Sequence, residues 1–500
     1  MAPFPGVVMA THARPVDAGG GTTPPAPRPD ATTAGSADHP GMVLVLMIGI
    51  FLSVLDFFIV SVAVPSIQRD LSATSATVQL TIAAYALGYA GLLIVGGRLG
   101  DIFGRRRMFS AGILLFTVAS VVCGVAPNAG SLIAGRVAQG LAAAIMTPQV
   151  LSIVSATLTG ASRARAFTAY GFTMGVAALF GQLIGGALIW ADPMGLGWRS
   201  VFLINVPIGV AALVLVPRRV PESRATGRPV LDLPGMILIS LAMGAMVLPL
   251  IEGRERGWPL WAWLCLAAAL MLFAAFMVRE RAVAGRRAAP LVHPGLFHDR
   301  AFSAGLLTQL FFYFGQASFF LVFAVYVQNG RGFSALQAGV LFIAIGGGYM
   351  ATSLIAQRVA MRLGRQVIAL GALLRTTAAV LMIAALAGPA GEGSIWWLVP
   401  ALVIDGAGQG LAVAPLASTV LSRIDPQHAG AASGVLSTGI WAGNAFGVAI
   451  IGVIFYGTLS RVDGDPFRDA FSASLVFIAV VGVLVATLVQ FLPRAPLSAR

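Results

Sequence analysis

The sequence contains no lysine, only two cysteines and few charged side chains of any kind. Of its 500 residues 10% are charged and 58% are hydrophobic, and the mean hydropathy is +0.88. This composition lies far outside the range of soluble globular proteins and predicts an integral membrane protein. Cys123 and Cys265 stand in apolar runs without metal-ligand spacing. We therefore expect two small buried apolar residues, and neither a disulfide framework nor a metal site.

Recognisable catalytic motifs are also missing. The sequence has no H-E-x-x-H zinc motif, no Walker A phosphate loop and no G-x-S-x-G nucleophile elbow, which argues against an enzyme or an ATP-driven pump. The acidic stretch at 463–469 lacks the glycine and the distal glutamate of a calcium loop. His293 and His298 have no standard helical metal spacing. We predict no enzymatic activity, no metal and no cofactor.

Apolar runs of about twenty residues, by contrast, are abundant. A helix of this length crosses roughly 30 Å of hydrocarbon. The runs are continuous and lack the alternating pattern of outer-membrane barrels, so the predicted fold is all-α. Fourteen transmembrane spans are predicted, near 42–64, 77–97, 108–126, 130–154, 166–190, 200–217, 232–251, 260–279, 301–327, 335–357, 366–387, 395–421, 430–457 and 471–492.

The distribution of arginine predicts the orientation in the membrane. About 23 of the 32 arginines fall in the two tails and in the loops on one side, so the positive-inside rule places both termini in the cytoplasm. The net charge of +13 is then explained by topology and anionic headgroups, and we expect no nucleic-acid partner. An arginine-only basic set with abundant Ala, Gly and Val favours a GC-rich bacterial genome, and hence the bacterial cytoplasmic membrane.

Short sequence matches indicate an internal duplication. QGLA at 139–142 recurs at 409–412, and VLS at 150–152 recurs at 420–422, both with an offset of 409 − 139 = 270. Spans 1–6 and 9–14 are therefore predicted to be two six-helix pseudo-repeats, with a substrate site between them near the bilayer midplane. The predicted domains are a disordered tail without a cleavable signal (1–41), an N-terminal half (42–217), linkers with two inserted helices (218–300), a C-terminal half (301–492) and a second tail (493–500).

Four motifs in order resemble the major facilitator superfamily, and in particular its fourteen-helix drug:proton antiporters. GRLGDIFGRRR at 97–107 is similar to the family's loop signature after helix 2, and LIAGRVAQGLAAA at 132–144 is similar to its helix 4 signature. LDFFIVSVAVPSI at 55–67 resembles the helix 1 motif of fourteen-helix members, and WRSVFLINVPIG at 198–209 resembles the stretch entering helix 6. The resemblance covers residues 42–492 and implies proton-coupled efflux of drugs, antibiotics or other amphipathic molecules by alternating access.

The resemblance also implies a gating latch in the loop after helix 2. In the family, the loop aspartate sits against the N-terminus of a helix in the other half and helps to close the cytoplasmic side. Asp101 and Arg105 are the predicted latch residues, while Gly104 permits the tight turn and Gly97 belongs to the same motif. The predicted partner is the thirteenth span, starting near Gly430, because a helix N-terminus favours a carboxylate. The alternative is that these charges are simply solvated.

Four ionisable residues fall inside predicted spans, where each is costly and suggests a function. They are Asp56, Arg136, Arg375 and Asp405. By resemblance, Asp56 meets substrate or proton, and Arg136, with Gln139 in the same signature, takes part in proton coupling. Asp405 is a second candidate for the coupling acid. The alternatives are an ion pair between Asp405 and Arg375, and purely structural roles for Asp56 and Arg136.

Helix 5 departs from the family pattern. The antiporter motif centres on a Gly-Pro pair, whereas Gln182 stands where the proline belongs. This departure leaves open a proton-coupled importer, and Gln182 either faces the cavity or is tolerated in packing. A transport-inactive membrane sensor with the same fold is a separate alternative. The small residues that are predicted to permit close helix packing are Gly171, Gly175, Gly181 and Gly185.

Aromatic and amide side chains within the spans suit a cavity for a large, partly apolar ligand. The candidates are Phe57, Phe58, Gln309, Phe312, Tyr313, Gln316, Gln409, Trp441 and Asn444. We expect the protein to act as a monomer in the lipid bilayer, with an amphipathic small molecule and protons as its partners.

Overall fold

The computed structural model of the chain describes residues 40–224, 232–285, 294–388, 390, 393–421, 429–461 and 465–492. Fourteen helical segments in this part are long and apolar enough to cross a membrane, and no strand occurs in it. The predicted all-α fold with fourteen spans is therefore confirmed. The predicted tails lie outside the described residues, apart from the first two residues of α1, and so does His293.

The helices fall into two groups of six spans and one inserted pair. The first group is α1 (Pro40–Asp70), α2 (Ser75–Phe103), α3 (Arg105–Gly124), α4 (Ala129–Thr157), α5 (Gly160–Ala191) and a sixth span made of η2 (Gly197–Arg199), α6 (Ser200–Leu203) and α7 (Asn205–Arg219). The inserted pair is α8 (Leu233–Glu255) and α9 (Leu260–Gly285). The second group is α10 (Arg300–Val325) with the π-helical turn η4 (Tyr326–Gly330), α11 (Ala335–Leu363), α12 (Gln366–Ala387), α13 (Val399–Leu421), α14 (Ala429–Leu459) and α15 (Pro466–Leu488). Short 3₁₀ turns complete the described chain: η1 (Pro193–Gly195), η3 (Pro294–His298), η5 (Ile395–Leu398) and η6 (Val489–Phe491).

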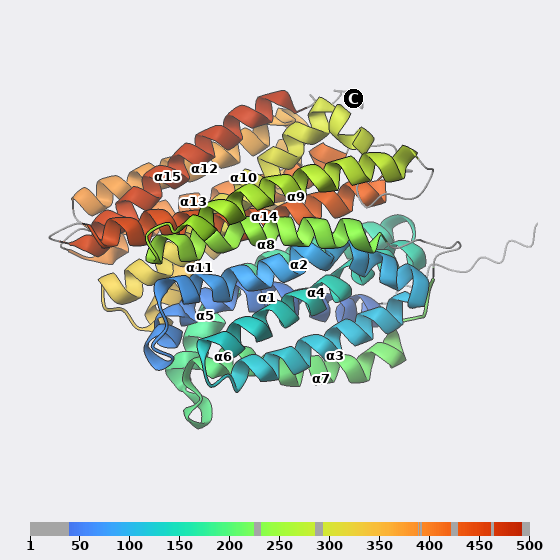
Figure 1. Cartoon of the computed structure of the whole chain (residues 1–500), viewed down its shortest axis with the longest axis horizontal. Coiled ribbons are helices and arrows are strands. Elements are labelled where there is room, and N and C mark those ends of the chain that lie inside the picture. Colours follow the sequence, from blue (N-terminus) through green and yellow to red (C-terminus); the bar gives the residue numbers. More distant parts are fainter. Residues whose placement is uncertain are drawn as a thin grey trace, which may run out of the picture. The chain divides into compact units, whose positions relative to one another are not determined.

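The same helix pairs form in both groups. In the first, α4 packs on α2 and α3, α1 packs on α5, and α7 packs on α1 and α3. In the second, α13 packs on α11 and α12, α10 packs on α14, and α15 packs on α10 and α12. Because each contact has its counterpart in chain order, the two groups are the predicted pseudo-repeats. The inserted α8 packs on α9 and lies beside α2 and α14, where the two groups meet (Figure 1).

Two equivalent helix pairs, α2 with α14 and α5 with α11, join the groups. Glycine allows the second pair to approach closely, since a Cβ added at Gly186 would lie 2.4 Å from the carbonyl oxygen of Ala335. Gly104 and Gly364 follow α2 and α11 with φ of 105° and 55°, a conformation that residues with a side chain rarely adopt. The repeat is therefore visible in the turns as well as in the packing.

The inserted helix α8 is fastened to α2 by polar contacts at one end of the bundle. Glu255 accepts hydrogen bonds from Ser75 Oγ at 2.6 Å and from the Ala76 amide at 2.7 Å. A carboxylate is thus placed at the N-terminus of α2, where the helix dipole stabilises it. We call this end of the bundle, where α1 finishes, the Asp70 end, and the opposite end, where α2 finishes, the Asp101 end.

Candidate functional site

Asp56 and Arg136 form a fully buried ion pair inside the first helix group. The Arg136 guanidinium donates to the Asp56 carboxylate through Nη1 and to the Thr81 carbonyl oxygen through Nε at 3.0 Å. Gln139 Nε2 and Asn205 Nδ2 donate to Asp56 Oδ1 at 2.9 and 2.6 Å. The carboxylate of α1 therefore accepts side-chain hydrogen bonds from both α4 and α7. The opposite charges compensate each other and both carboxylate oxygens accept hydrogen bonds, so the pair is tolerated in the interior, although Arg136 Nη2 has no hydrogen-bond partner among the described residues.

An aromatic layer covers this ion pair. The Tyr85 ring lies 4.5 Å from Arg136 Cζ, in cation–π geometry. The rings of Phe57, Tyr85 and Tyr89 lie 5.1, 5.7 and 4.1 Å from the Trp441 ring of α14. Trp441 lines the two cavities described next, whereas neither member of the ion pair lines them. The predicted acid is thus separated from the cavities by aromatic rings in this conformation.

A small cavity of about 50 Å³ lies between the two helix groups, and we call it the central cavity. Six of the predicted cavity residues line it, namely Phe58, Tyr313, Gln316, Gln409, Trp441 and Asn444. Phe57, Gln309 and Phe312 do not line it. The remaining lining residues, not predicted from the sequence to face a cavity, are Val54, Met174, Gly175, Ala178, Leu179, Tyr349, Val413 and Ile440.

A larger cavity of about 850 Å³ runs from the central cavity to the Asp101 end, and we call it the Asp101-end cavity. The two cavities share four lining residues, Val54, Met174, Ile440 and Trp441. Three predicted latch residues, Gly97, Asp101 and Arg105, lie in the wall of the larger one. The central cavity therefore adjoins the larger cavity, which opens between the groups at this end.

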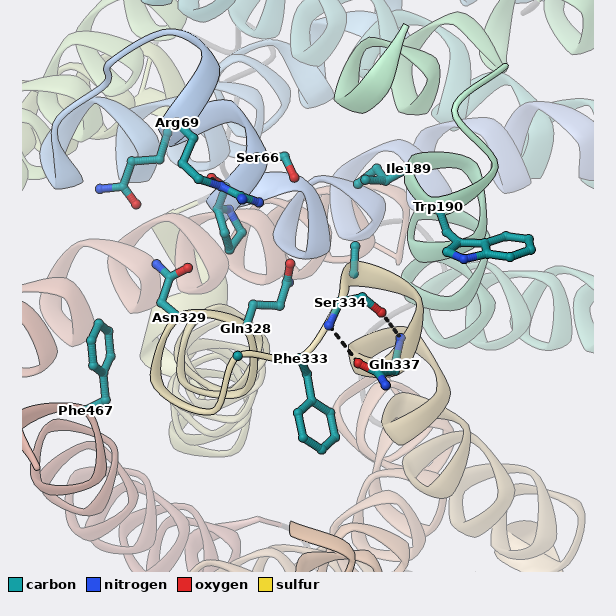
Figure 2. A pocket seen from close by; sticks show the side chains of 14 residues that line it. Ser66, Arg69, Ile189, Trp190, Gln328, Asn329, Phe333, Ser334, Gln337 and Phe467 are labelled. Carbon is teal, nitrogen blue, oxygen red and sulfur yellow. Dashed lines mark hydrogen bonds between the residues drawn. The ribbon is translucent and has the colours of Figure 1, made fainter. Parts of the chain in front are cut away.

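A third cavity of about 920 Å³ opens at the Asp70 end and shares no lining residue with the central cavity. Ser66, Arg69 and Trp190 line it from one helix group, and Gln328 and Phe333 line it from the other (Figure 2). Contacts between the groups separate it from the central cavity. Gln328 Nε2 donates to the Val62 carbonyl oxygen at 3.0 Å, and the rings of Phe58 and Phe320 lie 5.3 Å apart.

A second buried ion pair lies in the other helix group and is connected to the central cavity. Arg375 Nε donates to Asp405 Oδ1 at 3.1 Å, so the pair considered as an alternative from the sequence does form. Gln409 Nε2 donates to Asp405 Oδ2 at 2.7 Å, and Gln316 Nε2 donates to Gln409 Oε1 at 2.8 Å. Both glutamines line the central cavity, so Asp405 is a single side chain removed from it.

Comparison with known proteins places these features in a family. The sequence profile described as "Major Facilitator Superfamily" matches residues 46–448 and 305–500. The chain belongs to the Major Facilitator Superfamily. It is therefore a multi-pass membrane transporter of small molecules and not an enzyme.

Relatives within the superfamily include antibiotic exporters. The chain is 34% identical over 465 residues to the probable actinorhodin transporter of Streptomyces coelicolor, covering 91% of this chain and 80% of that protein. It is 35% identical over 464 residues to the puromycin resistance protein of Streptomyces alboniger, covering 90% of each. The cephamycin export protein of Amycolatopsis lactamdurans is 35% identical over 458 residues, with 87% and 89% covered.

Solved structures of the superfamily share the fold. The xylose transporter of E. coli in a partially occluded inward open conformation superposes with a TM-score of 0.63 at 16% identity, covering 92% of this chain and 99% of that one. A POT family transporter gives 0.66 at 15% identity, covering 90% and 95%. At such low identity these likenesses concern the fold alone.

The loop signature of the superfamily is held by contacts within the first group. Asp101 pairs with Arg105 at 2.9 Å, and Arg105 Nη1 donates to the Ser152 carbonyl oxygen at 3.4 Å. Glu222, which the sequence reasoning missed, accepts from the Arg106 amide at 3.1 Å and so sits at the N-terminus of α3. Asp101 and Gly434 of α14 line the same cavity, but residues 422–428 before α14 lie outside the described part.

In α5, the buried amide of Gln182 stands at the position where the antiporter motif has a proline, and the glycines around it allow close packing. Gln182 is 0% exposed, donates to the Phe58 carbonyl oxygen at 2.6 Å and lines neither the central nor the Asp101-end cavity. An added Cβ would lie 2.6 Å from Ile59 at Gly185, 3.4 Å from Leu55 at Gly181 and 2.5 Å from Tyr349 at Gly175. The predicted close packing does not extend to Gly171, where an added Cβ would meet no atom within 4 Å because the helix surface is open there.

Proposed function

We propose that the protein exports amphipathic small molecules, antibiotics among them, in exchange for protons. The observation that carries the proposal is the Asp101-end cavity, which lies between the halves and adjoins the central cavity through four shared lining residues. The arginine distribution assigns the Asp101 end, and with it both termini, to the cytoplasm. In this orientation a molecule in the cytoplasm or the inner leaflet has a route of about 850 Å³ to the boundary between the halves. Such a route is what an exporter needs for loading.

The relatives support an antibiotic-like substrate. The names of three relatives refer to actinorhodin, puromycin and cephamycin, and each name describes that relative alone. The walls of the central cavity in this chain agree with the mixed polarity of such compounds, because they combine aromatic rings with three amide side chains. Aromatic rings bury large apolar area, while amides provide a few directed hydrogen bonds.

Transport proceeds by alternating access, in which the halves 42–217 and 301–492 rock as units about the central cavity. Closure at the Asp101 end brings the latch residues against the other half, while the contact between Gln328 and Val62 opens at the Asp70 end. A single chain in the lipid bilayer contains both halves, which is all that alternating access requires. The proposed transporter therefore acts as a monomer.

Proton coupling rests on the Asp56–Arg136 ion pair. A proton on Asp56 removes the charge that compensates Arg136, so protonation and release of Arg136 occur together. The Trp441 ring offers the physical link to substrate, because it lines both cavities and also contacts Tyr85, which stacks on Arg136. A ligand that displaces Trp441 thereby loosens the layer that seals the ion pair. Asp405, behind Gln409, is the second acid of the scheme.

The available driving force is sufficient for export. A proton that crosses 100 mV supplies about 2.3 kcal/mol, and one pH unit adds about 1.36 kcal/mol. Together these terms support roughly a 500-fold gradient of a neutral substrate for one-to-one exchange.

The test is substrate-driven proton movement in inside-out membrane vesicles with an imposed pH gradient. A panel of antibiotics and lipophilic cations should dissipate the gradient with wild type. Asp56→Asn should abolish the response, and Asp192→Asn, which changes a loop carboxylate outside both ion pairs, should preserve it. Abolition by Asp405→Asn alone would move the coupling acid to α13. Absence of any response from correctly inserted wild type would overturn the proposal.

A further inference from the structure

Two amide oxygens in the wall of the central cavity are buried without a hydrogen-bond partner among the described residues. They are Gln316 Oε1 and Asn444 Oδ1, on side chains that belong to residues 6% and 2% exposed. A buried acceptor without a donor is penalised, so such groups in a cavity wall point to a ligand that satisfies them.

The orientation of Gln316 follows from a chain of hydrogen bonds that starts at Asp405. The Asp405 carboxylate, paired with Arg375, can only accept hydrogen bonds. Gln409 must therefore present its Nε2 to Asp405, which turns its Oε1 toward Gln316. Gln316 in turn must present its Nε2 to Gln409. Of the two ends of the Gln316 amide, the oxygen is left without any hydrogen-bond partner within the described part of the chain, while the NH₂ group keeps a second N–H beyond the one donated to Gln409.

We propose that the central cavity selects ligands that carry an N–H or O–H donor beside an aromatic or apolar body. Gln316 Oε1 accepts the hydrogen bond from this donor. Asn444 Oδ1 is a second acceptor in the same wall. The inference rests on the proposed function in one respect, namely that the central cavity binds the transported molecule.

The donor, and not positive charge alone, is the feature that this wall distinguishes. Arg375 compensates the charge of Asp405, so the acceptors at the cavity are neutral amide oxygens. The rings of Phe58, Tyr313, Tyr349 and Trp441 attract any cation or apolar body without requiring a donor. Removing the donor while keeping the charge and the body therefore isolates the contribution of the acceptors in this wall, and the Gln316→Met variant then separates the share of Gln316.

Imipramine and its quaternary N-methyl salt provide this comparison. Both carry one positive charge near pH 7 on the same tricyclic body, but only the protonated tertiary amine has an N–H donor. Binding to the purified full-length protein in lipid nanodiscs is measured by isothermal titration calorimetry. We expect imipramine to bind about tenfold more tightly or better, because a charge-assisted hydrogen bond is made by one ligand and not by the other. Equal affinities, or no binding of either compound, would overturn the inference.

Three variants locate the effect. Gln316→Met keeps the shape of the side chain without its acceptor and should bring the ratio of affinities close to one. Gln409→Met frees Gln316 to present either end of its amide, and should lower the ratio several-fold. The matched control is Gln309→Met, two turns earlier on α10, where a buried amide with an unpartnered Oε1 lies outside the cavity. Its ratio should equal that of wild type, and a loss there equal to the loss in Gln316→Met would refute the assignment.

Failure of the inference and failure of the proposed function give different results. Drug-driven proton flux in vesicles without any preference for the donor would overturn only the inference. Preference for the donor without flux would leave the binding site in place and overturn export. Thermal unfolding of each variant is measured in parallel, and affinities are compared only for variants that are folded at the temperature of the binding experiment.

Discussion

The buried ion pair between Asp56 and Arg136 makes a large and testable contribution to folding. Asp56→Asn replaces a carboxylate that accepts from Arg136, Gln139 and Asn205. The amide that replaces it has one acceptor oxygen, and its NH₂ group must face at least one of these donors. Arg136, 0% exposed, would also lose its counter-charge.

Breaking a buried pair from one side costs about 3–5 kcal/mol, because the remaining charge is left uncompensated. We expect Asp56→Asn and Arg136→Gln each to lower the free energy of unfolding by about this amount. The double variant leaves no buried charge behind, so it should lose clearly less than the sum of the two single losses. Asp101→Asn, with a half-exposed carboxylate and one partner four residues away, should lose less than about 1 kcal/mol.

The assay is reversible unfolding in mixed detergent micelles, followed by circular dichroism, for wild type, both single variants, the double variant and Asp101→Asn. Two outcomes would refute the reasoning. One is single losses below about 1 kcal/mol, which would mean that the pair is hydrated or absent. The other is strict additivity in the double variant, since residues in direct contact should couple. The result also decides how a loss of proton flux in Asp56→Asn is interpreted.

Four further predictions concern glycine packing, a helix end and a buried amide. Gly185→Ala should destabilise the protein by about 1–3 kcal/mol in the same unfolding assay, because the new methyl group would overlap an isoleucine of α1. Gly171→Ala, where space is open, should be neutral or stabilising by up to about 1 kcal/mol. Glu222→Gln should lower the free energy of unfolding by less than about 1 kcal/mol, with a difference from wild type that shrinks as salt is added, because the charge at the N-terminus of α3 is partly exposed. Gln182→Leu should lose about 0.5–1.5 kcal/mol, the net value of one hydrogen bond, and antibiotic-driven flux in vesicles should persist because Gln182 lines neither the central nor the Asp101-end cavity.

The spans and the repeat were predictable because both are encoded locally. A run of apolar residues long enough to cross the bilayer forms a helix whatever its neighbours are, since no other arrangement satisfies the backbone in hydrocarbon. The register of the repeat was predictable from the glutamines. Gln139 and Gln409, found by their offset of 270, each donate to a buried aspartate of an ion pair.

The partners of the polar residues were predictable only in part. The ion pair of Asp405 with Arg375 was considered from the sequence as an alternative, because the two residues lie on consecutive helices, and the structure shows that it forms. Asn205 was missed because its motif at 198–209 does not indicate which of its residues meets a buried partner, and Glu222 was missed because a glutamate in such a position carries no local signal. Their roles arise from Asp56, 149 residues away in sequence, and from the Arg106 amide, 116 residues away.

The sequence by itself determined the membrane-embedded fold, the duplication and the family, because hydrophobic run length and short motifs are properties of neighbouring residues. Only the tertiary structure decided which side chains meet the central cavity. It buried Asp56 behind Tyr85 and Trp441, turned Gln182 toward α1 and brought Gln316 and Gln409 to the wall. The physical reason is that apolar transmembrane helices carry almost no periodic signal that distinguishes their lipid, packing and cavity faces. The face that a helix turns to its neighbours is set by close packing and by the need to pair every buried polar group.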